Sequence, residues 1–301
     1  MTNSNLKYQW KTANISIKII VINVLIFLIA RLGAWILKIQ PRNFMEWFVL
    51  PADFSELILQ VWGIVTYSFL HFDFFHIFWN MLMLYWFSQF VLNLFTEKRF
   101  LTIYLLGAIS GGALFVLAYN FFPVLEGQRG FLIGASAAVL SIIVFVATYV
   151  PNTQIRVFTF TLKVWHIALF LVLGDIIRLS GSSDTQDVIA NNSGGLIAHL
   201  GGALFGFLYG NQLKKGNDIG RWFENAMDKA VSLFKPKKKS PLRTVHKAKK
   251  TKNTAAVKRT VSNAKNPNQA EIDAILDKIS KSGYDSLTKQ EKDFLFKAGK
   301  D

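Results

Sequence analysis

The first two thirds of the chain alternate long apolar runs with short polar breaks. A helix that crosses a bilayer needs about 20 predominantly apolar residues. Six runs approach or exceed that length, at residues 15–39, 74–95, 100–122, 131–150, 162–179 and 195–213. The pattern predicts an all-α polytopic membrane protein whose six-helix bundle occupies residues 1–213. The first run follows a polar start and lacks a small-residue cleavage site, so we expect it to be retained.

The composition agrees with this class. Hydrophobic residues make up 51% of the 301 residues, 27 of them are Phe, and the mean hydropathy is +0.30. These values are high for a soluble domain. The chain has no cysteine, which excludes disulfides and thiolate metal ligands.

The charge is concentrated in the tail. Residues 1–210 hold 12 basic and 9 acidic residues, a net charge of +3, whereas residues 211–301 hold 22 and 10, a net charge of +12. The basic character therefore says little about chemistry in the membrane bundle.

The tail is predicted in three parts. Residues 214–234 carry apolar side chains at helical spacing and predict an amphipathic helix at the membrane interface. Residues 235–268 predict a basic disordered linker, since residues 235–259 hold eleven basic and no acidic residues. Residues 269–301 predict a short helical hairpin. The expected partner of the linker is anionic lipid of the inner leaflet; nucleic acid is disfavoured because no aromatics interleave the lysines.

We expect the protein to lie in the cell membrane. The distribution of Lys and Arg between loops predicts that both of its termini are cytoplasmic. In that orientation the second, fourth and sixth runs all begin at the outer face. Each of these three beginnings carries polar residues: His71, His76 and Asn80 in the second, Ser136 in the fourth and His199 in the sixth. Because polar side chains at membrane depth are costly, we expect them to face the bundle interior or a water-filled cavity.

These side chains are predicted to lie in one layer. Ser136 comes about five residues into its run and His199 about four. His76 and Asn80 are four residues apart and therefore share one face of a helix. Gly202 and the small residues around it permit the close helix approach that a Ser–His hydrogen bond of about 2.6–3.2 Å requires.

Serine hydrolysis is the chemistry that these residues favour. His199 can take the proton of Ser136 and return it to a leaving amine. A serine near a helix N-terminus also has free N–H groups where an oxyanion develops. No acidic residue is evident as a third member, so the residues favour a dyad over a triad. Asp175 is expected to pair with Arg178, three residues further along the same run.

Two other interpretations compete with hydrolysis. A serine in a membrane helix often serves packing alone. A metal site could use His71, His76 and His199, but the first two are five residues apart, about 140° around a helix, whereas helical zinc pairs are usually four apart. We therefore predict neither a metal nor a cofactor.

Thirteen residues together match a known pattern. They are Trp62, Thr66, Tyr67, His71, His76, Asn80, Gly134, Ala135, Ser136, Ala198, His199, Gly202 and Gly206. As a set, they resemble the rhomboid family of intramembrane serine proteases over roughly residues 15–213. The resemblance implies a six-transmembrane-helix rhomboid-like bundle with a Ser–His dyad in a water-filled cavity open to the outer side. It also implies cleavage of single-span membrane proteins near the outer ends of their helices.

The resemblance assigns a role to each polar residue. Ser136 is the nucleophile and His199 the base. The side chains of His76 and Asn80, with the backbone N–H of Ser136, form the oxyanion hole, and His71 supports the site.

The chain departs from the family pattern at three positions. Ala137 stands where the family usually has Gly, Leu140 replaces an aromatic residue of some relatives, and Gly63 stands where an Arg often follows the Trp. The alternative function is a non-catalytic membrane protein that binds or escorts transmembrane helices in the same cavity.

Overall fold

The computed structural model describes residues 6–125, 130–157, 159–180, 193–234 and 267–298. The chain forms two compact units, Met1–Lys237 and Lys238–Asp301. Residues 235–266, which include most of the predicted linker, lie outside the described residues.

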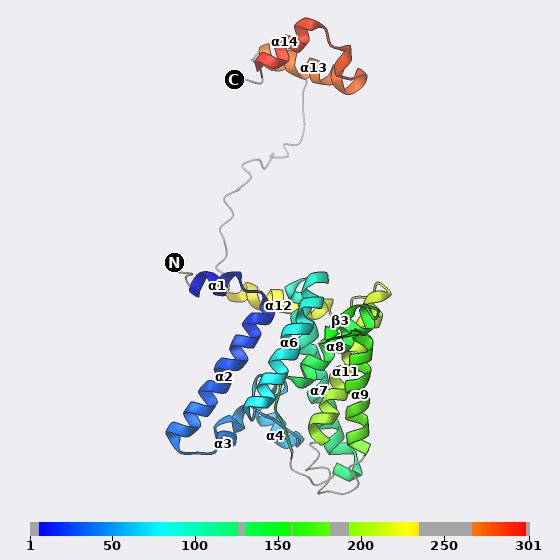
Figure 1. The fold of residues 1–301 in the computed structure, drawn as a ribbon. Helices are drawn as coiled ribbons and strands as arrows, with labels where there is room; N and C mark the ends of the chain where they lie inside the picture. Colours follow the sequence, from blue (N-terminus) through cyan, green and yellow to red (C-terminus); the bar gives the residue numbers. More distant parts are fainter. Residues whose placement is uncertain (1–5, 126–129, 158, 181–192, 235–266, 299–301) are drawn as a thin grey trace, which may run out of the picture. The chain divides into compact units, whose positions relative to one another are not determined.

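Six long helices build the first unit (Figure 1). They are α2 (Ile15–Leu37), α6 (Phe74–Leu94), α7 (Glu97–Phe121), α8 (Ser136–Tyr149), α9 (Val164–Ser180) and α11 (Ser193–Lys214). Each coincides with one predicted run, and all except α8 begin and end within three residues of the prediction.

Three of these helices, α2, α6 and α7, are long and apolar enough to cross a membrane, and α8 is apolar but has 14 residues. The chain is therefore a membrane protein with apolar helices. The count of six spans stays a prediction.

The start of the fourth helix was predicted wrongly. The apolar run begins at residue 131, but α8 begins at Ser136. The residues before it form strand β2 (Phe131–Leu132), which pairs antiparallel with β1 (Leu50–Pro51). A strand pairing between segments about 80 residues apart in the chain has thus replaced the first turn and a half of the helix.

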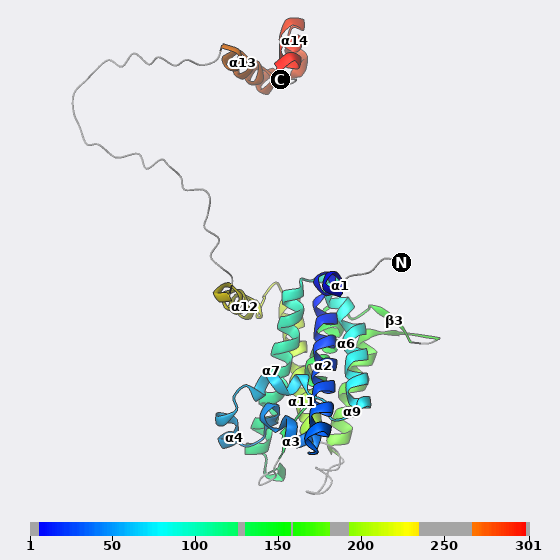
Figure 2. The same ribbon diagram turned by 90° about the vertical axis from the view of Figure 1, so that its left-hand side faces the viewer.

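The segment between α2 and α6 is folded into short helical pieces. They are α3 (Pro41–Met45), η1 (Glu46–Phe48), α4 (Phe54–Leu59), α5 (Gly63–Thr66) and η2 (Tyr67–Phe69). Figure 2 shows α4 projecting from one side of the bundle and the hairpin of β3 (Gln154–Val157) and β4 (Phe160–Lys163) from the other.

Side-chain hydrogen bonds to backbone carbonyls hold this segment together. Trp62 Nε1 donates to the carbonyl of Trp47 at 2.6 Å, and Thr66 Oγ1 donates to that of Phe48 at 2.7 Å. The buried hydroxyl of Tyr67 donates to the Ala108 carbonyl of α7 at 2.7 Å. The first two bonds hold the segment together, and the third attaches it to α7.

Helices α8 and α11 touch at their backbones. A Cβ added to Gly202 would collide with the Ala137 carbonyl, and one added to Gly206 would collide with the Ser141 carbonyl. Glycines four residues apart on α11 therefore form the small-residue ridge that was predicted, and α8 lies directly on it.

Helix α7 packs into the same contact. A Cβ added to Gly111 would lie 2.6 Å from the Ala137 Cβ and 2.7 Å from the Ala198 carbonyl oxygen. Ser110 Oγ donates to the Gly201 carbonyl at 2.9 Å. Three helices thus meet with almost no side-chain volume between them.

Charged residues fasten helix α12 (Arg221–Phe234) to the bundle. Arg99 at the start of α7 pairs with Asp218 and, at 3.5 Å, with Glu224. The hydroxyl of Tyr209 on α11 also donates to Asp218 at 2.9 Å. Helices α1 (Leu6–Thr12) and α12 lie at one end of the bundle, and α3 and α4 lie toward the other (Figure 1).

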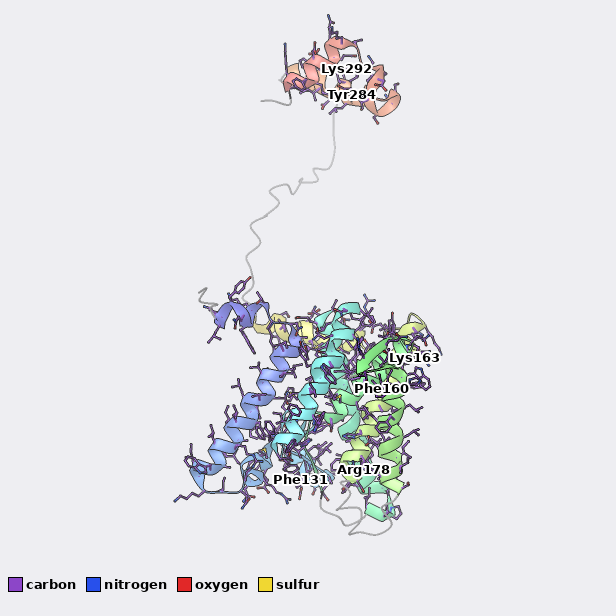
Figure 3. The ribbon with its side chains drawn as sticks, viewed as in Figure 1. Phe131, Phe160, Lys163, Arg178, Tyr284 and Lys292 are labelled. Atoms are coloured by element: carbon purple, nitrogen blue, oxygen red, sulfur yellow. The ribbon has the colours of Figure 1, made fainter. Side chains whose placement is uncertain are left out.

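The second unit consists of α13 (Pro267–Ser282), η4 (Tyr284–Ser286) and α14 (Lys289–Ala298). Thr288 and Glu291 cap α14 reciprocally: the Thr288 N–H donates to Glu291 Oε2 at 2.7 Å, and the Glu291 N–H donates to Thr288 Oγ1 at 3.3 Å. Hydrogen bonds from Lys278 and Thr288 lower the pKa of the Glu291 carboxyl to about 2. Figure 3 shows the Lys292 side chain beside Tyr284, whose ring centroid lies 4.8 Å from the ammonium nitrogen.

We expect Gly202→Val to destabilise the bundle by about 1–3 kcal/mol, because the added side chain forces α11 away from the Ala137 backbone. The measurement is thermal unfolding of the purified chain in detergent. Gly174→Val on α9 is the matched control, since a Cβ there has nothing within 4 Å among the described residues. Equal stability of the two variants would show that the bundle tolerates separation of α8 and α11.

Candidate active site

Ser136, the predicted nucleophile, is the first residue of α8. Its neighbours Ala135 and Ala137 are buried, while Ser136 itself is partly exposed. The N–H groups of the first helical turn have no carbonyl partner within the helix, and the helix dipole is positive at this end. An anion formed beside Ser136 would therefore meet both backbone donors and a favourable field.

Gly134 brings the Ser136 hydroxyl and the His76 ring to the same place. Its φ of +124° is one that residues with a side chain rarely adopt, and its N–H donates to the Tyr67 carbonyl at 2.9 Å. A Cβ added to Gly134 would lie 2.7 Å from His76 Nε2 and 3.7 Å from Ser136 Oγ. The absence of that atom lets His76 approach the serine.

His71 supports the chain just before Ser136. It is 2% exposed, and its Nε2 accepts a hydrogen bond from the Ala135 N–H at 3.4 Å. Its ring also packs edge-on against His76, with centroids 5.0 Å apart. Because Nε2 accepts, the neutral ring carries its proton on Nδ1, which has no hydrogen-bond partner among the described residues. Both contacts fit the supporting role that the resemblance implied.

Asn80 is buried close by, but its side chain is bonded within its own helix. Its Nδ2 donates to the His76 carbonyl at 2.8 Å, one turn back. A side-chain amide has two N–H groups, so one donor remains for a ligand. His76 Nε2 and Ser136 Oγ both lie within 4 Å of the position that a Gly134 Cβ would take, and neither predicted oxyanion donor, His76 or Asn80, is hydrogen-bonded to Ser136 among the described residues.

His199 on α11 is paired with a carboxylate. Its Nδ1 lies 2.9 Å from Oδ2 of Asp175 on α9, and the two side chains are 25% and 13% exposed. The prediction that no acidic residue is available as a third member is therefore wrong. The sequence carried a signal for this pair, because Asp175 is the only acidic residue in an apolar helix and such a residue needs a partner.

Helix packing sets the distance between Ser136 and His199. The neighbour of each, Ala137 and Ala198, lies against the same glycine of α7, Gly111. No hydrogen bond joins the serine to the histidine in the described part of the chain, and catalytic hydrogen bonds are often long in the absence of substrate. With Nδ1 facing Asp175, Nε2 is the atom of His199 available to the serine.

The three histidines do not combine into a metal site in the described ranges, where no group of three or more His, Asp or Glu side chains converges for a metal ion. The arrangement instead offers a hydroxyl, a histidine base and donors for an oxyanion, which are the elements of acyl transfer.

Comparisons with known proteins agree with the pattern. A family model described as the Rhomboid domain matches residues 59–215, about half of the chain. A second model, described as a family of unknown function (DUF6576), matches residues 257–297.

Curated relatives each match about 60–70% of the chain. The human presenilin-associated rhomboid-like protein, mitochondrial, is 30% identical over 201 residues, which are 64% of this chain and 46% of the relative. The zebrafish presenilin-associated rhomboid-like protein A, mitochondrial, is 27% identical over 59% of this chain and 43% of the relative. Rhomboid protein 1, mitochondrial, of Saccharomyces cerevisiae is 28% identical over 67% of this chain and 56% of the relative. The chain spans about half the length of the curated relatives it matches.

Gly134→Ala tests the close packing of His76 against Gly134, two residues before Ser136. We expect labelling of Ser136 by a fluorophosphonate probe to fall by roughly 10-fold or more, because the methyl group occupies the space of His76 Nε2 and the backbone is strained. The measurement is the labelling rate at a fixed probe concentration.

Gly216→Ala is the control for that test. Its φ of +85° is also positive, but an added Cβ has no described atom within 4 Å. Equal labelling of both variants would contradict a functional contact at Gly134.

Proposed function

Because the chain belongs to the rhomboid family, we propose that it is an intramembrane serine protease that hydrolyses peptide bonds of transmembrane proteins. The observation that carries the proposal is that Ser136 Oγ, at the start of α8, and the His76 ring both lie within 4 Å of the position that a Gly134 Cβ would take. A serine that serves packing alone would require neither a histidine nor a helix N-terminus close by.

The proposed reaction begins at the serine hydroxyl. Ser136 Oγ attacks the carbonyl carbon of the scissile bond while Nε2 of His199 accepts the hydroxyl proton. The histidine then gives that proton to the amine that leaves. Water attacks the acyl-enzyme in a second step, again with His199 as base, and the free serine is restored.

Three donors stabilise the oxyanion in this proposal: the Ser136 N–H, the His76 ring and the second amide proton of Asn80. A donor that meets the charge only in the transition state raises turnover more than it tightens binding. In the tautomer that donates, His76 carries its proton on Nε2, the ring atom closest to Gly134.

The proposed substrates are single-span membrane proteins, cut near the outer end of their helix. Helix α8 has 14 residues and is about 21 Å long, and it runs toward the end of the bundle that carries α12 and the β3–β4 hairpin (Figure 1). Ser136 therefore lies toward the other end, where α3 and the β1–β2 pair are found. Figure 3 labels Phe131 and Arg178 at that end and Phe160 and Lys163 at the end near α12.

We propose that the protein lies in the cell membrane with both termini in the cytoplasm, the orientation that the Lys and Arg distribution favours. The matched relatives are named as mitochondrial proteins. Cell fractionation with protease protection of tagged termini distinguishes the two membranes and fixes the orientation.

We expect Ser136→Ala and His199→Ala each to lower the cleavage rate by roughly 1,000-fold or more, with the double variant no worse than either single one. Nucleophile and base act as one unit, so their losses do not add. The assay is cleavage of candidate single-span proteins in liposomes, with thermal unfolding as the control for folding. A chain that binds transmembrane helices without cleaving them, and whose Ser136 resists fluorophosphonate, would instead fit the non-catalytic alternative.

We also propose that the basic linker binds anionic lipid at the inner leaflet, with α12 lying in the interface. Trp222 is 63% exposed and Leu233 82% exposed on α12, so apolar side chains are available to the membrane. The pairing of Arg99 with Asp218 and Glu224 ties this helix to the bundle.

A peptide of residues 235–259 is expected to bind vesicles of anionic lipid but not of neutral lipid, and to be released as salt rises. Each of its eleven cations contributes about 1 kcal/mol at most near an anionic surface. Flotation assays measure both effects. Binding to neutral vesicles at high salt would contradict the proposal.

A further inference from the structure

The contact between Asp175 and His199 has no part in the two-residue mechanism. Asp175 lies on α9 and His199 on α11, and their side-chain atoms Oδ2 and Nδ1 are 2.9 Å apart. Both side chains are largely shielded, at 13% and 25% exposure. An acidic residue in an apolar helix is costly to keep charged without a partner, and here the partner is the candidate base.

We propose that Asp175 is the positioning residue of the site, so that the working unit is Ser136, His199 and Asp175 rather than a dyad. The proposal deepens the proposed function and rests on it. Asp175 touches neither substrate nor the reacting atoms; it acts through the histidine ring.

The contact selects one tautomer of His199. A carboxylate only accepts hydrogen bonds, so Nδ1 must carry a proton to bond with it. In the neutral ring, Nε2 is then unprotonated and free to accept the proton of Ser136. The opposite tautomer could not act as the base.

The contact also sets the orientation of the ring. The backbone of α11 beside His199 is held by α7 and α8, since Ala198 lies against Gly111 and Gly202 against Ala137. Backbone packing leaves the side-chain torsions of His199 undetermined. The bond to Asp175 supplies that missing constraint from a third helix.

The proton balance is simple. When Ser136 attacks, its hydroxyl proton moves to Nε2 and the ring becomes a cation. Asp175 stays ionised, keeps the Nδ1 proton in its hydrogen bond and stabilises the imidazolium by its charge. The Nε2 proton then leaves with the amine, and the ring is neutral again.

The rival explanation is an ion pair that merely joins α9 to α11. The positioning role and the purely structural role predict different effects of Asp175→Asn on turnover. Asn has nearly the same size and can bond Nδ1 either as donor or as acceptor, so helix packing survives while control of the tautomer is lost. For a positioning role we expect turnover to fall by roughly 100- to 10,000-fold with the Michaelis constant changed by less than about 3-fold.

The closing experiment measures the tautomer directly and without any substrate. The full chain has five histidines, so nitrogen NMR of the histidine-labelled protein can be assigned with single substitutions. We expect neutral His199 to carry its proton on Nδ1 in the native chain and to populate the Nε2–H form in Asp175→Asn. Asp228→Asn, which removes an exposed carboxylate paired with Lys98, is the control and should leave both the spectrum and turnover unchanged.

An Asp175→Asn chain with unchanged tautomer and turnover overturns the proposal. An Nε2–H tautomer in the native chain overturns it even if Asp175→Asn unfolds, because that tautomer is measured on the unsubstituted chain. Full cleavage by Ser136→Ala would instead remove the proposed function and leave the NMR result on Asp175 standing.

Discussion

Direct backbone contact between α7, α8 and α11 is the constraint on which the rest of this structure depends. In a bilayer the hydrophobic effect does not drive helices together, so packing and hydrogen bonds must do so. Gly111, Gly202 and Gly206 remove the side chains that would hold the three helices apart. Two residues at that contact, Ala137 and Ala198, are next to the candidate nucleophile Ser136 and the candidate base His199 in the sequence. The backbone positions of Ser136 and His199 are therefore set by direct helix packing rather than by flexible side chains.

Around this contact, each polar group of the site is positioned from a different part of the fold. The β1–β2 pair ends the extended chain before Ser136 and allows the helix to begin at the serine. His71 bonds the Ala135 N–H from the segment before α6, and His76 enters the space that Gly134 leaves open. Polar side chains in a low-dielectric interior interact strongly, and they are costly when unpaired. A site assembled from separate helices at these close distances can therefore be well ordered only if every supporting element is in place.

The charged cluster at the other end of the bundle has a different physical role. Arg99 joins the start of α7 to Asp218 and Glu224, which follow α11. This cluster fixes α12 to α7 and α11, two of the three helices that form the small-residue contact. If α12 attaches to a lipid surface, the ion pairs of Arg99 with Asp218 and Glu224 connect that surface directly to the bundle, without the linker.

The sequence alone determined much of the secondary structure, because a bilayer permits few alternatives. An apolar run of about 20 residues must satisfy its backbone within itself, so the extent of α2, α6, α7, α9 and α11 could be predicted closely. Ser136, His199, His76, Asn80 and His71 could be named as candidates for the same reason: polar groups are too costly at membrane depth to be incidental. The spacing of His76 and Asn80 likewise placed them on one helical face, and the glycines of α11 predicted close packing.

Tertiary structure decided what depends on partners distant in the chain. The start of α8 could not be predicted, because residues 131–132 are apolar enough for a helix and become a strand only by pairing with Leu50 and Pro51. The partner of Asp175 was also unpredictable from spacing: Arg178 lies one helical turn away in sequence, whereas His199 is 24 residues away and reaches Asp175 only when α9 packs on α11. Local hydrogen bonding and hydropathy can be predicted from a single segment of the sequence. Which two segments come into contact depends on the register and rotation of the packed helices. That register is fixed by the fit of all the helices together, and no single stretch of the sequence contains it.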